Sequence, residues 1–444
     1  MPGDSVPIIA AIVNLHSSGP RARRTAAVAI AAALLSPWLA TACAAVPGQT
    51  TGPPTPAGGA TAPVANVAPA AGVTAPAATS ATSTLTLWSV AELEPQQGEG
   101  LGALADAWAA SDPLTTLIVS RRPGRGEYGV IAYLDIISRV APAALPDVVP
   151  LPLADVAAAR QSGLILPLPS ALADSAQLAQ SWPFARAAVI DAQDDDDRAW
   201  ALPLAVTAPH IAWPTPRDAP PSSWQDLVLQ TRLALPDATD PTALSTALSL
   251  YAAHGGDPST LPAIDRDAAA AWLSALATGR ESISLSPAPL AALAAGEVDA
   301  AIIGAGDYVE AWARGEATGW STLTGPTGPA PIVATGWAMA LVARPGADTG
   351  RGVALIEALT AEIAPTWTFR AGLLPANRAA WAESLRSLPD PPPSDYRDFI
   401  ALRLESARHP AQLAGTAPRW GEATRAVLAG EEIVSALDKL TAPR

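Results

Sequence analysis

Aromatic rings are the first side chains in this sequence that suggest specific chemistry. The chain has 14 Trp against 5 Tyr and 3 Phe. An indole offers a flat apolar face and one N–H donor, which suits the ring faces of a sugar. We consider four tryptophans as candidates for ligand contact: Trp88, Trp213, Trp320 and Trp337. The alternative is packing in a core, which we expect of those in helical patterns, namely Trp108, Trp224, Trp272 and Trp312.

Polar residues that could bind hydroxyl groups form a second set of candidates. Carboxylates accept hydrogen bonds from hydroxyls, and a guanidinium donates to acidic groups. Glu92 and Glu94, with Gln96 and Gln97 beside them, follow a short alternating apolar run, and they could equally be a solvated acidic loop. Further along the chain the candidates are Asp307, Tyr308 and Arg370, the last of which could instead pair with a carboxylate of the protein itself.

Several classes of chemistry find no support in the sequence. The single cysteine, Cys43, excludes a disulfide within the chain, and the four scattered histidines lack the spacing of a zinc site. Asp194–Asp197 could attract calcium, but a solvated turn is the better interpretation because the run lacks spaced ligands. We find no phosphate loop and no nucleophile elbow, so we expect neither an enzyme nor a cofactor. The net charge of −14 argues against nucleic-acid binding.

The first 84 residues have the organisation of a secretory leader and a tether. Three arginines (Arg21, Arg23 and Arg24) precede an uncharged run from 25 to 42 that ends in small residues directly before Cys43. These are the parts of a secretory signal, and the small residues before the cysteine resemble a bacterial lipobox. The alternative is a single membrane anchor. Residues 43–84 are almost wholly Ala, Pro, Thr, Gly, Val and Ser, a composition that predicts a disordered tether.

Elements of alternating type must position the candidates after residue 84. Strand patterns at 85–88, 114–119 and 146–150 alternate with helical patterns at 101–110, 127–140 and 154–161, and Gly163 is suited to end the last helix. This order predicts an α/β fold with a mostly parallel sheet. Ligands of such sheets lie beyond the carboxyl ends of the strands, which places loops 89–100 and 120–127 at a candidate binding edge.

Nine segments in order resemble family 1 extracellular solute-binding proteins. The resemblance covers 85–440, and its most characteristic parts are PDVVPLPLADVAAARQSGLILPL (146–168), HGGDPSTLPAIDRDAAAAWLSAL (254–276), LAAGEVDAAIIGAGDYVEAW (293–312), TGWAMALV (335–342) and FRAGLLPANRAAW (369–381). It implies a periplasmic-binding-protein-like fold of type II, with two α/β lobes, a hinge and a ligand cleft between them. The family often places a ligand-facing aromatic at the position of Trp337, whereas Asp307 and Tyr308 depart from its usual pair.

The resemblance and the leader together predict function and organisation. We expect a signal peptide at 1–42, the tether at 43–84, one lobe from 85–205 with 334–385, and the other from 206–333 with 386–444. The predicted role is to capture a small solute and deliver it to an ABC permease. The abundance of tryptophan favours a mono- or oligosaccharide as that solute. The chain would be a monomer, lipid-anchored at Cys43 on the outer face of the cytoplasmic membrane. The alternative is an envelope adhesion or assembly lipoprotein that keeps the fold without a transport ligand.

Overall fold

The computed structural model of this chain describes residues 83–94, 100–125, 129–190, 198–316, 319–361, 366–411, 413 and 416–442. Cys43, the predicted leader, Gln96, Gln97 and Asp194–Asp197 lie outside these residues, as does the predicted tether up to residue 82. Residues 78–444 form one compact unit, which carries all the elements below. Within the described part of the chain, no helix has the length and apolar character needed to cross a bilayer.

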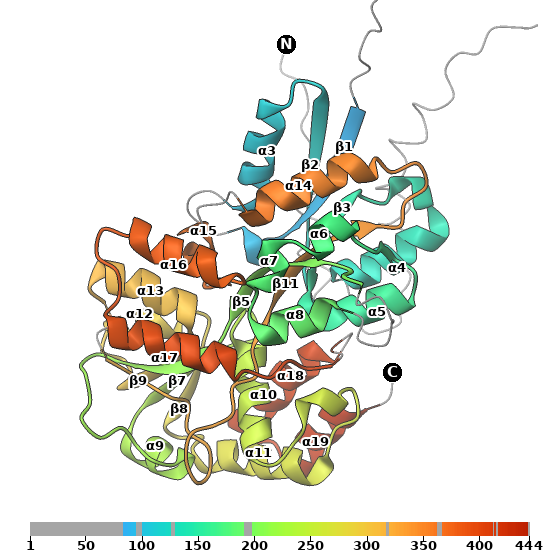
Figure 1. The fold of residues 1–444 in the computed structure, drawn as a ribbon. Coiled ribbons are helices and arrows are strands. Elements are labelled where there is room, and N and C mark those ends of the chain that lie inside the picture. Colours follow the sequence, from blue (N-terminus) through green and yellow to red (C-terminus); the bar gives the residue numbers. More distant parts are fainter. Residues whose placement is uncertain are drawn as a thin grey trace, which may run out of the picture. The chain divides into compact units, whose positions relative to one another are not determined.

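The first lobe is built on a seven-stranded mixed sheet, and we name it lobe 1 (Figure 1). The strand order is β12-β5-β11-β3-β1-β2, with β4 paired to β11. Its strands are β1 (Ser83–Val90), β2 (Thr115–Arg122), β3 (Val148–Pro152), β4 (Ile165–Leu166), β5 (Leu202–Thr207), β11 (Thr335–Val342) and β12 (Leu374–Pro375). The predicted strands at 85–88, 114–119 and 146–150 are therefore confirmed, with β1 beginning two residues before Leu85. The prediction of a mostly parallel sheet is wrong here, because the parallel pairs among the described strands are those of β1 with β2 and β3, whereas β11 and β5 pair antiparallel with their neighbours.

Helices that pack around this sheet come from the same stretches of chain. The longer ones are α3 (Leu101–Ser111), α4 (Val130–Val140), α8 (Pro183–Val189), α14 (Thr349–Ala361) and α16 (Arg378–Ser387). Short helices connect the strands: η2 (Ala91–Leu93), η3 (Pro142–Ala144), η4 (Leu153–Asp155), α5 (Val156–Gln161), α6 (Ser170–Ala173), α7 (Ala176–Ala179) and α15 (Thr366–Arg370). Gly163 follows α5 with φ of 64°, as predicted for a residue that ends a helix in the left-handed region.

The second lobe is built on a five-stranded sheet, and we name it lobe 2. Its order is β10-β6-β9-β7-β8, with β6 (Pro209–Trp213), β7 (Leu233–Pro236), β8 (Ile283–Ser286), β9 (Ala300–Gly304) and β10 (Gly319–Ser321). Its helices are α9 (Trp224–Gln230), α10 (Ala243–Ala253), η5 (Pro258–Thr260), α11 (Arg266–Thr278), α12 (Pro289–Ala294), α13 (Ala305–Arg314), α18 (Ala417–Leu428) and α19 (Ile433–Thr441). Figure 1 shows α18 and α19 beside α10 and α11, which they contact.

The chain passes between the lobes at short segments. Ala208 alone separates β5 of lobe 1 from β6 of lobe 2, and residues 322–334 lead from β10 back to β11. The helix α17 (Ser394–Glu405) contacts α8 of lobe 1, and its Tyr396 hydroxyl donates to the Ala305 carbonyl of α13. Two lobes joined by such short crossings can move as rigid bodies about them. The residue limits that we predicted for the lobes stay predictions.

Two features of the lobe 1 sequence affect the pairing of its central strands. Pro150 and Pro152 lack an N–H, and β3 pairs with β1 at Val148 alone, whereas it pairs with β11 over five residues. Gly336 lies where β11 crosses β5 closely, since a Cβ on it would be 2.3 Å from the Ala205 carbonyl oxygen. The register of β5 and β11 shifts just beyond it, between Trp337 and Ala338.

Candidate functional site

Two adjoining cavities lie where the lobes face each other. The smaller has a volume of about 410 Å³ and the larger about 1330 Å³. Arg125 of lobe 1 and Leu244 and Ala417 of lobe 2 line both of them. Small-molecule sites commonly measure about 300 to 1,000 Å³. The smaller cavity therefore has the size of a ligand site, and the larger one has the size of an open cleft beside it.

The walls of the larger cavity come from the carboxyl ends of strands in both sheets. In lobe 1, Glu92 follows β1 and Arg125 follows β2. In lobe 2, Asp240 follows β7, the 287–291 segment follows β8, and Asp307 follows β9. Loops at the carboxyl ends of parallel strands are the usual place for ligands in open α/β sheets. The described residues of loops 89–100 and 120–127 lie at the carboxyl ends of β1 and β2, as expected, and ligand binding there stays a prediction.

Arg125 lies at the junction of the two cavities. Its guanidinium is 5.1 Å from the centre of the Trp337 ring, and its Nη1 approaches the Pro241 carbonyl oxygen of lobe 2 at 3.5 Å. Burial lowers the pKa of Arg125, and the charges of Glu92 and Asp155 oppose that change. The guanidinium thus bridges the lobes and presents fixed donors to both cavities. The sequence argument placed this loop at the edge but did not select Arg125; its position between two glycines just beyond a strand was the available signal.

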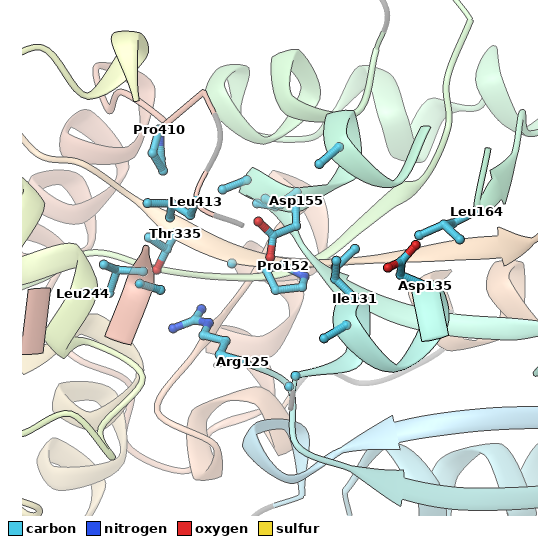
Figure 2. Close-up of a pocket in the computed structure, with 18 of the residues that line it drawn as sticks. Arg125, Ile131, Asp135, Pro152, Asp155, Leu164, Leu244, Thr335, Pro410 and Leu413 are labelled. Carbon is cyan, nitrogen blue, oxygen red and sulfur yellow. The ribbon is translucent and has the colours of Figure 1, made fainter. Parts of the chain in front are cut away.

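The smaller cavity combines apolar walls with a few polar groups. Figure 2 shows Leu244, Thr335 and Arg125 on one flank, and Ile131, Asp135 and Leu164 on the other. Asp155 also lines it. Thr335 is 5% exposed, and its hydroxyl has no hydrogen-bond partner among the described residues. A buried hydroxyl without a partner is costly in a folded protein.

Glu92 and Glu94 line the larger cavity, but each already accepts hydrogen bonds from its own lobe. Glu92 accepts from the Gly124 N–H at 3.0 Å. Glu94 accepts from the Gly102 N–H at 2.7 Å and from the Ser89 hydroxyl. The first contact holds the loop that carries Arg125, and the second holds the start of α3. The structure therefore brings these two carboxylates to the cleft in positioning roles; direct contact with a ligand stays a prediction.

Asp307 and Asp240 form an acidic pair on the lobe 2 side of the larger cavity. Asp307 accepts from the Gly304 N–H at 3.3 Å, and Asp240 accepts from the Thr242 N–H at 2.7 Å. Burial and the charge of Asp240 hold the pKa of Asp307 well above its ordinary value. Burial also raises the pKa of Asp240, to about 6. Both carboxyl groups therefore keep their protons to a higher pH than an ordinary aspartate does, chiefly because they are buried.

Glycines bring lobe 1 against the start of α13 beside this pair. A Cβ on Gly306 would be 2.4 Å from the Leu373 nitrogen, and a Cβ on Gly372 would be 2.7 Å from the Asp307 Oδ1. Gly372 has φ of 71°, a conformation that favours glycine. Arg370, which is exposed at the end of α15, lines the cavity on the same side. The contact between α13 and α15 thus places Asp307 and Arg370 on facing lobes.

The predicted aromatic residues pack in the lobes and are not among the residues that line the two cavities. Trp337 and Trp213 are fully buried, and the Trp213 N–H donates to the Ser321 hydroxyl at 3.0 Å. Trp88 is buried and packs edge-on against Tyr133. Trp337 nevertheless contacts the site indirectly, because it lies beneath Arg125. A role for these three rings in ligand contact stays a prediction.

Tyr308 and Trp320 belong to an aromatic cluster between lobe 2 and α17. The Tyr308 and Tyr396 rings stack with centres 4.2 Å apart, and Trp320 packs edge-on against both. His210 joins them at 5.3 Å from Tyr308, and burial lowers its pKa to about 3. These rings fix α17 against the first strand after the crossing at Ala208. As with the other aromatic candidates, a ligand role for Tyr308 and Trp320 stays a prediction.

The described residues do not meet the requirements of a metal site. No group of three or more His, Cys, Asp or Glu there has an arrangement that could hold a metal ion.

Comparison with known proteins gives likeness at the level of the fold. No family model matches the chain, and no curated protein matches it in sequence. Solved structures do: the GacH receptor of Streptomyces glaucescens, solved unliganded and with acarbose, has a TM-score of 0.61 at 17% identity, over 81% of this chain and 96% of that one. Maltose-bound MalE3 of T. maritima has a TM-score of 0.62 at 15% identity, over 81% and 98%.

A third structure extends the likeness to another bound sugar. It is an ABC transporter solute-binding protein of Thermotoga lettingae bound with α-D-tagatose, with a TM-score of 0.57 at 16% identity, over 81% of this chain and 98% of that one. At these identities the comparison establishes the fold. The predicted two-lobed, periplasmic-binding-protein-like architecture is therefore confirmed.

Proposed function

We propose that this chain is the solute-capturing component of an ABC importer and that it holds a saccharide between its two lobes. The observation that carries the proposal is the junction at Arg125, where strand ends of both sheets line two adjoining cavities. The three similar structures named above were solved with acarbose, maltose or α-D-tagatose, which supports a saccharide as the class of solute. Those proteins bind rather than transform their ligands, and we infer the same here.

Capture would proceed by movement of the lobes about the crossings near Ala208 and 322–334. A solute that enters the open cleft meets Arg125, Asp155 and Thr335 on lobe 1. Closure brings Leu244 and the start of α18 over it. Guanidinium and carboxylate groups suit ring hydroxyls, because the first donates and the second accepts in fixed directions. Burial by both lobes then couples binding to the closed shape that a permease would recognise.

We also propose an anchored location outside the cytoplasmic membrane. Cleavage of the leader before Cys43 would give a mature chain that begins at Cys43 and carries lipid on its thiol. Lipid with more than one acyl chain would hold it stably at the membrane. The uncharged residues up to 84 would act as a tether that gives the binding unit reach toward a permease. We expect the mature chain to act as a monomer with that permease as its partner.

Calorimetric titration of the mature chain with mono- and oligosaccharides tests the binding role. We expect one saccharide series to bind with one site per chain, and Arg125→Met to weaken it strongly because the ligand loses its central donors. Glu357→Gln, on an exposed position of α14 outside both cavities, is the matched control. If amino acids or polyamines bind and no saccharide does, the proposed ligand class is wrong, and the proposed importer role is left standing.

The importer role needs a separate test, because an adhesion or assembly lipoprotein could share the fold. Deletion of the gene should abolish uptake of the labelled saccharide that the purified chain binds, and the wild-type gene should restore uptake. A deletion strain with unchanged uptake and a defect in envelope attachment would favour the adhesion role instead.

A further inference from the structure

The smaller cavity has aliphatic walls. Its large apolar side chains are all Ile or Leu, namely Ile131, Ile136, Leu153, Leu164, Leu244 and Leu413. None of the described residues that line either cavity is Phe, Tyr or Trp. The flat rings that suit the faces of a sugar are therefore missing from the described walls. A sugar in the cleft would be held by polar groups, and the aliphatic walls suit a different apolar group.

The same cavity is elongated along α4. The residues of α4 that line it have the spacing of one helix face over two turns: Ile131, Ala132, Asp135, Ile136 and Arg139. The eight-residue rise from Ile131 to Arg139 corresponds to about 12 Å. Ala154, Ala158 and Ser162, four residues apart, line it from η4 to the end of α5. Figure 2 shows Ile131 and Leu164 at the end of the cavity away from Leu244. The cavity is thus a groove that leaves the cleft at Arg125 and follows α4.

The outer end of this groove offers little to a hydroxyl-bearing group. Asp135 and Arg139 form an ion pair with each other, so their charges are matched within α4. Ser162 adds one exposed hydroxyl. A further sugar unit would bring several hydroxyls to this end, and each hydroxyl left without a partner weakens binding about fivefold or more. An aliphatic chain has no such cost, because it carries no polar group.

Two exposed side chains on α4 independently indicate an apolar partner. Ile136 lines the groove and is 52% exposed, and Val140, one turn further along α4, is 69% exposed. Residues four apart on a helix are neighbours on its surface. The aliphatic surface therefore continues from the groove to the outside of lobe 1. Covering such side chains is favourable, because apolar area leaves water.

We propose that the solute is an amphiphilic glycoside, whose sugar ring lies at Arg125 in the cleft and whose aliphatic chain lies along α4 in the smaller cavity. This inference rests on the proposed function and names the ligand class of the same cleft. Arg125 lines both cavities, so one molecule can place its polar part in the cleft and its chain in the groove. The open end at Ile136 gives the chain a length limit that is set by α4.

A series of alkyl glycosides tests the inference on the mature chain. Calorimetric titration uses the methyl, butyl, hexyl and octyl β-glucosides and the matching maltosides, each below the concentration at which it forms micelles. Affinity should rise about twofold to fourfold for each added methylene, because each one leaves water for the groove. The gain should level off once the chain reaches the end of α4, which simple adsorption to the protein surface would not produce.

Variants assign the gain to the groove. Ile136→Ser should weaken octyl glycosides about threefold and leave methyl glycosides unchanged, since serine and isoleucine have similar helix propensity. Ala158→Leu places a larger side chain in the groove and should remove most of the gain from long chains. Val434→Ser is the matched control, because Val434 is 64% exposed on α19 and lines neither cavity. A thermal unfolding scan checks that each variant is folded.

The outcomes separate this inference from the proposed function. Equal affinity from methyl to octyl, in a series that binds, overturns the aliphatic chain and leaves saccharide capture standing. A gain that neither levels off nor changes in Ile136→Ser and Ala158→Leu is adsorption, and it overturns the chain as well. Binding of no glycoside in the series and of no free mono- or oligosaccharide overturns the proposed function itself.

Discussion

Neutralising Asp240 should stabilise the ligand-free protein, and should do so increasingly as the pH rises. Asp240 has a pKa of about 6 in the folded chain against 3.8 for an ordinary aspartate. The folded state therefore holds a proton longer than the unfolded chain does. Stability from this group is fully present below about pH 4 and is lost as the pH rises through about 6. Asp240→Asn removes that loss, because an amide does not ionise.

The size of the effect follows from the same two pKa values. Each pH unit between them corresponds to about 1.4 kcal/mol, so the folded chain loses about 3 kcal/mol of unfolding free energy from this group between pH 4 and pH 7. Asparagine can still accept from the Thr242 N–H through its side-chain oxygen, so the local hydrogen bond survives. Asp307 also loses the repulsion of its neighbour, which adds to the gain in the same direction.

Equilibrium urea unfolding of wild type and Asp240→Asn from pH 4 to pH 8 measures the difference. We expect the two midpoints to coincide near pH 4 and to separate steadily until about pH 7. The control is Glu357→Gln, which removes one negative charge from an exposed position of a chain with net charge −14. It corrects for the general relief of self-repulsion. If the two variants gain equally at every pH, the cost of ionising Asp240 in its buried position is refuted.

Other perturbations have definite expected outcomes. Arg344→Met leaves Asp147, which is 2% exposed, without its ion pair at 3.0 Å, and should cost about 3 to 5 kcal/mol in urea unfolding. Gly306→Ala forces a methyl group into the backbone before β12 and should lower the melting temperature or weaken binding, as scanning calorimetry and titration would show. The His210 ring should stay neutral at about pH 5 in an NMR titration, because its pKa is about 3; stability from this ring is lost as the pH falls from 6.5 toward 3. Cys43→Ser should release the protein from the membrane fraction in an immunoblot.

The elements of lobe 1 were predictable because their patterns are local. Alternating apolar residues identified β1 and β2, and TGWAMALV at 335–342 coincides with β11. A glycine after an apolar helical run identified the end of α5 at Gly163. The patterns of β1, β2 and α5 are decided by immediate neighbours in sequence, so they can be recognised without knowledge of the tertiary fold, whereas the segment 335–342 was predicted from the family resemblance.

The site was less predictable because it depends on distant contacts. Trp337 is covered by Gly124, whose Cβ would be 2.3 Å from the indole ring, although the two are far apart in sequence. No local pattern reveals that a ring will be buried in this way, so the abundance of tryptophan did not locate the cavity lining. The sequence argument proposed both Asp307 and Tyr308 as ligand contacts. Asp307 lines the larger cavity, whereas Tyr308 packs in the aromatic cluster.

Acidic groups within the lobes and at the cleft differ in whether an arginine pairs with them. The same chain pairs Arg344 with Asp147 in the interior of lobe 1, and Arg232 with Asp299 at the surface of lobe 2. At the cleft, Asp240 and Asp307 line one cavity, and Arg314 beside them pairs with Glu310 and Glu316. Burial of a carboxyl group at a cavity wall costs stability in the empty protein once the group ionises. Asp240→Asn should therefore raise the urea midpoint at pH 7, and titration of the same variant with the saccharide that the wild type binds should show no matching gain in affinity.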